Sequence, residues 1–265
     1  ARSSGDEFMK STLKRYVVKP LAKVVSRLLA ARGLQIAPLA DIADLSEPDR
    51  AILKRVEPFT LTGVDRRASL LLTVDHIVRH KIPGDIVECG VWRGGSMMAV
   101  ALALMARGDT SRHLYLYDTY EGMTEPTEAD KAHSGESAAA QLERTTRGEG
   151  VWCEAGIDDV QANLWSTGYP RDKIHFVKGP VEATIPATMP SQIALLRLDT
   201  DWYESTRHEL QHLYPLLERN GVLIIDDYGH WQGARQAVDE YFAASATPVF
   251  LHRVDYTARL HIKTA

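Results

Sequence analysis

The sequence predicts an α/β protein with a mostly parallel central sheet, and three observations lead to this prediction. Short apolar runs alternate along the chain with segments of helical periodicity, which is typical of βαβ units. Several of these runs end in glycine or acidic residues, as strands that approach a ligand site often do. The composition is that of a folded domain, with 265 residues, 45% hydrophobic and 25% charged, so a disordered or collagen-like chain is excluded.

Charge and cysteine content limit the possible partners and compartment. Residues 1–35 carry a net charge of +6, which leaves −10 for the rest of a chain whose total is −4. An acidic body argues against a large nucleic-acid interface. Two cysteines are too few for a disulfide framework, so we expect a cytoplasmic protein. No run reaches the roughly 18 apolar residues of a spanning helix, and no signal peptide is evident, so we expect no membrane insertion.

The N-terminal segment has its own pattern. From Ser11 to Leu29 apolar residues recur at steps of three and four, with cations on the other face and Pro20 as an interruption. We interpret this basic helix as an arm for self-association, and membrane-surface binding is the alternative. The sequence therefore predicts a helical arm and extension over residues 1–58 and the main domain over residues 59–265.

The main domain is expected to follow a regular order. A helix from Val64 to His80 precedes the first strand. Strands are expected at residues 85–89, 113–117, 173–178, 193–198 and 221–225, and helices between them at residues 97–105, 157–165 and 205–217. Residues 121–150 form a long polar stretch after a strand end, which is typical of a lid or binding loop.

The first two strands end in residues suited to a nucleoside with an anionic tail. Glu88 and Gly90 close the first strand, and Gly94-Gly95-Ser96 open the next helix. Small residues let the backbone approach a ligand, and a helix N-terminus favours an anion. The spacing is not the G-x-G-x-x-G of dinucleotide-binding proteins. Asp118 ends the second strand, where a carboxylate can accept hydrogen bonds from ribose hydroxyls.

Two acidic pairs follow neighbouring strands. Asp199 and Asp201 follow the fourth strand, and Asp226 and Asp227 follow the fifth. Four carboxylates at adjacent strand ends repel one another unless a cation neutralises them. A hard divalent cation, Mg²⁺ by preference, is the simplest solution. The alternative is structural, with Asp201 capping the following helix.

At this point the chain resembles a known family. Residues 84–241 are similar to the macrocin O-methyltransferases, which use a metal ion and S-adenosylmethionine to methylate sugar hydroxyls of natural products. The matching segments are Pro83–Ser96, Asp118–Gly122, Phe176–Gly179, Leu196–Tyr203 and Gly221–Tyr228. The resemblance implies a class I methyltransferase, Rossmann-like fold with helices on both faces of the sheet and extra N-terminal helices.

The resemblance also implies residue roles. Asp199, Asp226 and Asp227 would bind Mg²⁺, and Asp201, or otherwise Asp199, would be the general base. The residues implied to contact S-adenosylmethionine are Thr60, Leu61, Glu88, Gly90, Gly95, Ser96, Asp118, Thr119, Gly179 and Asp199. The partners implied are a small glycoside acceptor and further copies of the chain in a homo-oligomer.

The expected chemistry leaves the acceptor open. A sugar hydroxyl needs a metal ion to lower its pKa and a carboxylate to accept its proton. His230, Trp231 and Arg235 are candidates for acceptor contacts, whereas His133 has no clear counterpart in the family. A catechol-type methyltransferase is an alternative, because Trp152, Trp165, Trp202 and Trp231 could line an aromatic slot. A nicotinamide-dependent oxidoreductase and a non-catalytic nucleoside-binding protein fit the glycine spacing and the acidic residues less well.

Overall fold

The computed structural model describes residues 42–146, 152–245 and 248–264. The chain divides into two compact units, residues 1–44 and 45–265. The expected helix between Ser11 and Leu29 lies outside the described residues, and the domain boundary that we placed between residues 58 and 59 stays a prediction. None of the described helices is long and apolar enough to cross a membrane.

The helices and strands alternate along the chain. The α-helices are α3 (Glu47–Val56), α4 (Val64–Arg79), α5 (Gly95–Ala106), α6 (Ala138–Arg144), α7 (Ile157–Trp165), α8 (Val181–Thr184), α9 (Tyr203–Leu213) and α10 (Gln232–Ala243). The strands are β1 (Asp85–Cys89), β2 (Leu114–Asp118), β3 (Ile174–Lys178), β4 (Ile193–Leu198), β5 (Leu217–Ile225), β6 (His252–Arg253) and β7 (Arg259–Ile262). Short 3₁₀ helices cover Glu57–Phe59, Arg171–Lys173 and Tyr214–Leu216.

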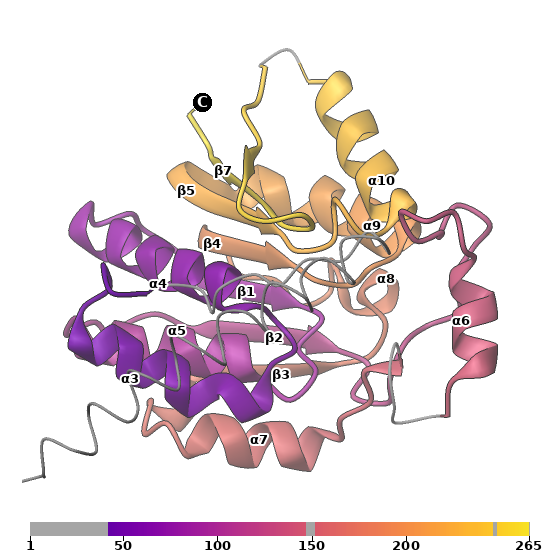
Figure 1. Cartoon of the computed structure of the whole chain (residues 1–265). Helices are drawn as coiled ribbons and strands as arrows, with labels where there is room; N and C mark the ends of the chain where they lie inside the picture. The colour runs from indigo at the N-terminus through magenta and orange to yellow at the C-terminus, as the bar shows by residue number, and fades with distance from the viewer. Residues whose placement is uncertain (1–41, 147–151, 246–247, 265) are drawn as a thin grey trace, which may run out of the picture. The chain divides into compact units, whose positions relative to one another are not determined.

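Seven strands form one sheet in the order β3-β2-β1-β4-β5-β7-β6 (Figure 1). Strands β1 to β5 pair in parallel, whereas β7 runs antiparallel to β5 and to β6. The chain winds outward from β1 to β3 and then returns to β4 on the other side of β1. The carboxyl ends of β1 and β4 therefore flank the switch point, where open α/β sheets bind their ligands.

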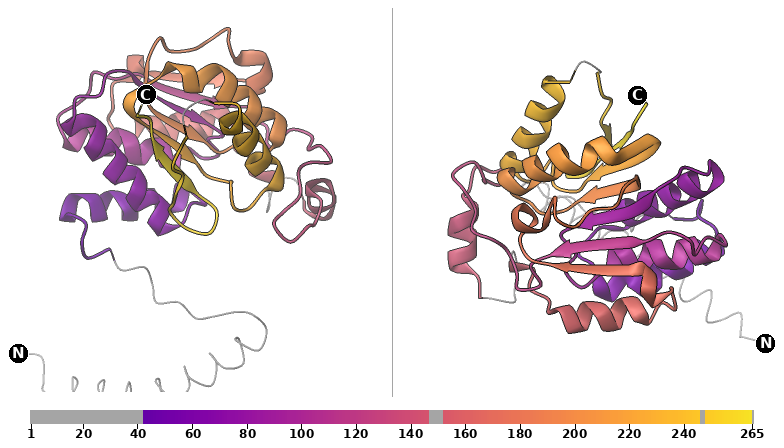
Figure 2. Two further views of the ribbon diagram at one scale, coloured as in Figure 1. Left: turned by 90° about the horizontal axis from the view of Figure 1, so that it is seen from above. Right: turned by 180° about the vertical axis from the view of Figure 1, so that it is seen from behind.

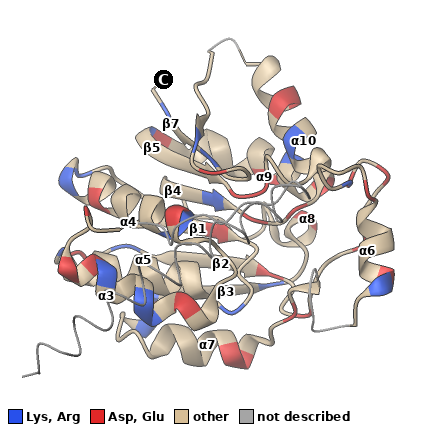
Figure 3. Cartoon of the chain, viewed as in Figure 1, with Lys and Arg blue, Asp and Glu red and all other residues tan. Residues whose placement is uncertain are grey.

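Helices cover both faces of the sheet. Helices α3, α4, α5 and α7 pack together on one face, and α8, α9 and α10 lie on the other (Figures 1 and 2). Helix α5 is apolar on nearly every side and is buried from Gly95 to Leu104, apart from Leu102. Strand β4 is buried along its whole length. This sandwich fixes the strand ends that carry the acidic residues, which lie in the loops after β4 and β5 (Figure 3).

The sequence-based prediction of the main elements is confirmed. The strand at 193–198 and the helix at 157–165 have the expected bounds, and the other expected elements overlap their observed counterparts. The expectation missed helix α3, whose start is marked by the Ser46 hydroxyl accepting a hydrogen bond from the Asp49 amide. It also missed α6 and the antiparallel pair β6–β7, which are short and lack a strong apolar period.

The segment after β2 is docked on the domain. The Trp202 indole donates a hydrogen bond to the Thr124 carbonyl, and Ala132 pairs with Trp231 in a β-bridge. Ala132, Ala138, Leu142, Trp202, Trp231 and Ala234 form a separate small apolar cluster. The described part of the expected lid, up to residue 146, is therefore anchored to the domain at Trp202 and Trp231.

Candidate active site

A cavity of about 240 Å³ lies beyond the carboxyl ends of β1, β4 and β5. It contains most of the residues selected from the sequence: Thr60, Leu61, Gly90, Gly95, Ser96, Asp118, Asp199, Asp201, Asp226 and Asp227. Its wall also includes Thr62, which belongs to the cofactor-side segment that the family resemblance implied, and residues for which the sequence predicted no role, namely Phe59, Arg66, Val91, Trp92, Gly122, Met123, Cys153, Tyr256 and Thr257. The sheet topology thus brings together residues from widely separated parts of the chain.

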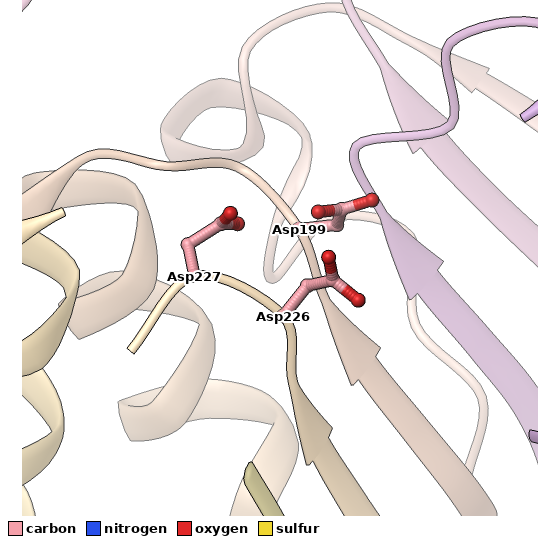
Figure 4. Close-up of side chains that lie close together, drawn as sticks. All are labelled: Asp199, Asp226 and Asp227. Atoms are coloured by element: carbon pink, nitrogen blue, oxygen red, sulfur yellow. The ribbon is translucent and has the colours of Figure 1, made fainter. Parts of the chain in front are cut away.

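Three aspartates converge at one edge of this cavity. Asp199 follows β4, and Asp226 and Asp227 follow β5 (Figure 4). One carboxylate oxygen from each lies within 4.8 Å of the others. Such a set of oxygen donors has the composition that hard divalent cations prefer.

Two arginines brace the acidic cluster. Arg197 is buried inside β4 and donates hydrogen bonds to Glu88 (2.5 Å), Asp199 (2.7 Å) and Asp226 (2.6 Å). Arg66, on α4, forms an ion pair with Asp226 and a second with Asp255 at 3.1 Å. Although burial opposes ionisation, these two guanidinium groups hold the pKa of Asp226 below its usual value. Asp226 is therefore an anion in a buried position.

The carboxylates of Asp199 and Asp227, at the same edge, have too little nearby positive charge to offset their burial and mutual repulsion. Burial, followed by repulsion from Asp226 and Asp227, raises the pKa of Asp199 well above its usual value despite Arg197. Burial and the neighbouring acids Asp201 and Asp226 do the same to Asp227. These partly buried groups need either protons or a cation to remain side by side. The residues present therefore fit a divalent cation held by Asp199, Asp226 and Asp227.

Asp201 lies next to this set. Asp227 and Trp231 are neighbours of its side chain, and burial together with Asp199 raises its pKa to about 7. Helix α9 begins after Trp202 and has no side-chain cap, so the alternative role of Asp201 as a helix cap is wrong. The amide of Tyr203 instead donates to the Asp130 carboxylate at 2.8 Å. Asp201 is thus free of the helix and faces the cavity.

Glu88 and the N-terminus of α5 have the chemistry that suits the methionine end of a nucleoside cofactor. Glu88 is almost fully buried, and its Oε2 has no hydrogen-bond partner among the described residues. Burial raises the pKa of Glu88 to about 7. The N-terminus of α5 has no side-chain cap, and Gly95 and Ser96 at this end line the cavity. A buried carboxylate suits an ammonium group, and uncapped helix N–H groups suit a carboxylate. Glu88 itself is not among the residues that line the cavity.

Gly90 and Gly95 serve protein packing rather than ligand approach alone. A Cβ on Gly90 would overlap the backbone carbonyl of Asp199, and one on Gly95 would overlap that of Phe59. Gly90 also has a φ of 78°, in the left-handed region. These two contacts bring the loop after β4 and the segment before α4 against the first strand–helix turn.

The segment Thr60-Leu61-Thr62 borders the same cavity. The Thr60 hydroxyl accepts a hydrogen bond from the Thr62 amide at 3.0 Å, which folds the segment into a tight turn. The Thr62 hydroxyl in turn accepts from Arg197 at 3.4 Å. Leu61 remains 63% exposed. The structure therefore places all three residues at the rim, on the side of α5.

The residues expected near the ribose border a second, smaller cavity. Asp118, Thr119 and Gly179 line a space of about 60 Å³ that adjoins the main cavity. Asp118 already accepts hydrogen bonds from the amides of Val91 (2.7 Å) and Tyr120 (2.7 Å). Its carboxylate therefore fixes the loops after β1 and β2 as well as facing the cavity.

The remaining candidates lie on the side of α10. His230 lines the main cavity and also a neighbouring hollow of about 490 Å³, which His133 and Arg235 share. The Tyr256 hydroxyl lies 3.2 Å from Nδ1 of His230. The rings of His133 and His230 are 5.4 Å apart, because the segment after β2 carries His133 to this position. Of the three candidates named for acceptor contacts, His230 borders the acidic edge, whereas Trp231 and Arg235 line only the second hollow.

No role was predicted from the sequence for Arg197 or Arg66. Arg197 was part of a matching segment, and a charged residue inside an otherwise apolar strand was a signal that could have been used. Arg66 carried no such signal, because its helix is rich in charge and only the fold brings α4 to β5.

The sequence of this chain matches a known protein family. Residues 47–263 match the family model described as macrocin-O-methyltransferase. The chain belongs to the macrocin O-methyltransferase family. The resemblance seen in the sequence is thereby confirmed, and the chain is an S-adenosylmethionine-dependent O-methyltransferase.

Named relatives support the family assignment. A tetracenomycin-C 4'-O-methyltransferase from Streptomyces olivaceus, named for its 2,3-dimethoxy-rhamnosyl substrate, is 34% identical over 77% of this chain and 77% of its own length. Demethyldecarbamoylnovobiocin O-methyltransferase from Streptomyces niveus is 29% identical over 69% and 68%. Mycinamicin III 3''-O-methyltransferase from Micromonospora griseorubida is 32% identical over 69% of each chain.

Solved structures confirm the fold class. The O-methyltransferase NovP matches with a TM-score of 0.69 and 28% identity, covering 78% of this chain and 83% of its own. A calicheamicin methyltransferase has a TM-score of 0.56 at 16% identity, covering 86% and 97%, and this likeness concerns the fold alone. This member of the macrocin O-methyltransferase family thus has the expected class I, Rossmann-like architecture.

Proposed function

We propose that this chain is a Mg²⁺-dependent O-methyltransferase that transfers a methyl group from S-adenosylmethionine to a hydroxyl of a sugar or deoxysugar on a glycoside. The observation that carries the proposal is the set of carboxylate oxygens of Asp199, Asp226 and Asp227 within 4.8 Å of one another. Asp201 lines the same cavity and has Asp227 as a neighbour. Metal ligands and a candidate base are therefore next to the cofactor side of one cavity.

Each side of the cavity has a proposed task. Glu88 and the uncapped N-terminus of α5 hold the methionine ammonium and carboxylate of the cofactor, which supplies the methyl group. Gly90, Thr60 and Leu61 line the path of the cofactor, and Asp118, Thr119 and Gly179 border the space for its nucleoside.

The chemistry of the acceptor follows from its high pKa. Bound Mg²⁺ supplies positive charge that lowers the pKa of an acceptor hydroxyl. Asp201 would accept the hydroxyl proton while the acceptor oxygen forms its bond to the methyl carbon, the methyl–sulfur bond breaks and S-adenosylhomocysteine leaves. Asp199 is the alternative acceptor for that proton. Asp226, braced by Arg197 and Arg66, remains an anion throughout. His230 stands at the mouth, where it can contact the acceptor.

The sugar acceptor is supported by the named relatives. The Streptomyces olivaceus protein is named for a rhamnosyl-tetracenomycin, and the other two for novobiocin and mycinamicin intermediates. A phenolic acceptor finds less support. Trp202 and Trp231 are buried in the small apolar cluster with Trp152 packed against it, and neither these three nor Trp165 lines the main cavity. The aromatic residues that do line it are Phe59, Trp92 and Tyr256, and the preference for a sugar therefore rests on the named relatives.

A binding and activity assay tests the proposal. Calorimetry is expected to detect S-adenosylhomocysteine and not NAD. A panel of deoxysugar glycosides and phenols with methyl-labelled S-adenosylmethionine is expected to label glycosides, to stop with EDTA and to recover with Mg²⁺. Labelling of phenols alone would contradict the acceptor class, and turnover that survives EDTA would remove the metal role of the three aspartates.

The remaining assignments are also proposals. We propose that residues 59–265 carry the activity, that the chain forms a homo-oligomer, and that the basic arm within residues 1–58 mediates self-association. A truncation that starts at Gly33 is expected to form smaller assemblies in light scattering. An unchanged assembly size would contradict the role of the arm.

A further inference from the structure

Glu209 is a buried acid that the proposed mechanism does not use. It lies on α9 and is completely buried. The Thr200 hydroxyl lies 3.0 Å from its Oε1 and 3.2 Å from its Oε2, and the thiol of Cys89 is a further hydrogen-bonding neighbour. Glu209 forms no ion pair with any residue in the described part of the chain. A buried acid without a cation costs stability and therefore calls for an explanation.

The partner of Glu209 occupies a central position. Thr200 separates Asp199, a proposed metal ligand, from Asp201, the proposed base. Its carbonyl accepts a hydrogen bond from the Trp202 amide at 2.8 Å, and its side chain is fixed by Glu209. Both the main chain and the side chain of Thr200, which connects Asp199 to Asp201, are therefore fixed by hydrogen bonds.

Asp201 has an unusual backbone. Its φ is 68°, in the left-handed region that residues with a side chain seldom adopt. Such a conformation persists only where the surrounding contacts determine it, and it is often found at functional sites. Thr200, whose hydroxyl contacts Glu209, is the residue directly before Asp201 in the chain.

We propose that Glu209 is a positioning residue that acts through the Thr200 hydroxyl to hold Asp201 in its left-handed conformation, with the carboxylate facing the proposed metal site. This inference rests on the proposed function, because it assigns a purpose to the placement of Asp201. Burial, with repulsion from Glu182, raises the pKa of Glu209 well above its usual value, so a neutral side chain suffices for the contact. Glutamine is therefore expected to replace it, whereas leucine is not.

A double-mutant cycle tests the contact through kcat. Thr200→Val and Glu209→Leu each remove the hydrogen bond and are expected to lower kcat about 10-fold or more, the scale of a misplaced catalytic group. The double variant is expected to be no slower than the slower single variant, because both remove the same interaction. Thr200→Ser and Glu209→Gln keep the contact and are expected to retain most of the activity. Binding of S-adenosylhomocysteine is expected to stay within about twofold throughout.

The controls separate local from general effects. Glu204→Leu changes an exposed residue of the same helix and is expected to leave kcat unchanged. If Glu209→Leu does not fold, Thr200→Val compared with Thr200→Ser still decides the matter, because valine is isosteric with threonine. Full activity of Thr200→Val, or strictly multiplicative losses in the cycle, would overturn the proposal.

A stability measurement tests the backbone conformation independently of catalysis. At a left-handed position glycine is expected to be more stable than alanine. Asp201→Gly is therefore expected to melt at a higher temperature than Asp201→Ala, and this difference is expected to shrink when Thr200→Val is added. An equal difference in both backgrounds would refute the positioning role. If Asp201→Asn keeps full activity while the melting difference shrinks as expected, the proposed base is wrong but the positioning contact stands.

Discussion

Arg197 Nη2 donates a 2.6 Å hydrogen bond to Oδ1 of Asp226, and both side chains are buried. The same guanidinium also bonds Glu88 at the end of β1 and Asp199 after β4. One cation therefore ties together the proposed cofactor side and the proposed metal side of the cavity. The positive charge of Arg197 explains how the carboxylates of Glu88, Asp199 and Asp226 can lie close together at the carboxyl ends of the strands.

Loss of this cation is expected to destabilise the fold. Arg197→Met leaves Glu88 and Asp226 buried with fewer positive partners, and breaking a buried ion pair in this way typically costs about 3–5 kcal/mol. The free energy of unfolding, measured with urea near neutral pH, is expected to fall by that order. Mild acid should reduce the loss, because protonation removes the unpaired charges.

An exposed arginine provides the matched control for Arg197. Arg207 pairs with Glu204 on the surface of α9. Arg207→Met is expected to change the free energy of unfolding by no more than about 0.5 kcal/mol, since exposed ion pairs contribute little. Equal stability of the two variants would show that Arg197 does not hold the acidic cluster.

Gly95 is expected to tolerate no side chain. Gly95→Ala places a Cβ against the Phe59 carbonyl, so either α5 or the turn at Thr60 must move. The affinity for S-adenosylhomocysteine, measured by calorimetry, is expected to fall at least about 10-fold, since small displacements at a binding site are costly. Gly156→Ala, at the start of α7, has no heavy atom within 4 Å of the new Cβ and is the control. Similar affinities in both variants would contradict this role of Gly95.

Asp201 is expected to affect turnover and not cofactor binding. Asp201→Asn keeps the size of the side chain but removes the proton acceptor, so kcat is expected to fall by about 10²–10⁴-fold. Calorimetric affinity for S-adenosylhomocysteine is expected to stay close to that of the unmodified protein. Asp158→Asn, an exposed change on α7, is the control. Unchanged turnover in Asp201→Asn would assign the proton to Asp199 or to another group.

The spacing of apolar residues and the residue types that follow each strand made much of the fold predictable. Apolar runs such as Ile193–Leu198 identify a buried strand directly, and acidic residues after two neighbouring strands must meet when those strands are parallel. Asp199, Asp226 and Asp227 were therefore found together as expected. The family resemblance added the residues of the cofactor side.

Contacts between segments that are far apart in the sequence could not be predicted from these patterns. Nothing in the local sequence brings Arg66 to Asp226 or His133 to His230, because these pairs depend on helix packing and on the path of the segment after β2. The left-handed backbone of Asp201 could not be predicted from the sequence either. A glycine at this position would have suggested it, whereas an aspartate adopts it only occasionally. Short elements such as α6 offer too few turns for a period to be recognised.

Mg²⁺ binding is expected to depend on pH in a defined direction. Burial and mutual repulsion raise the pKa of Asp199 and of Asp227 well above the usual value, and that of Asp201 to about 7. A raised pKa means that the folded, metal-free protein holds protons that the unfolded chain has already released. The stability from these groups is present at low pH and is lost as the pH rises through the raised pKa values.

The cation reverses this loss because it replaces the protons. Melting temperatures with and without Mg²⁺ are expected to differ more near pH 8 than near pH 6. With the ion at about 100 times its Kd, the gain near pH 8 is expected to approach about 2.7 kcal/mol, or roughly 5–10 °C. Asp227→Asn is expected to abolish most of the gain, whereas the exposed Asp158→Asn should preserve it. A larger gain near pH 6, or none near pH 8, would mean that these carboxylates carry protons rather than a metal ion.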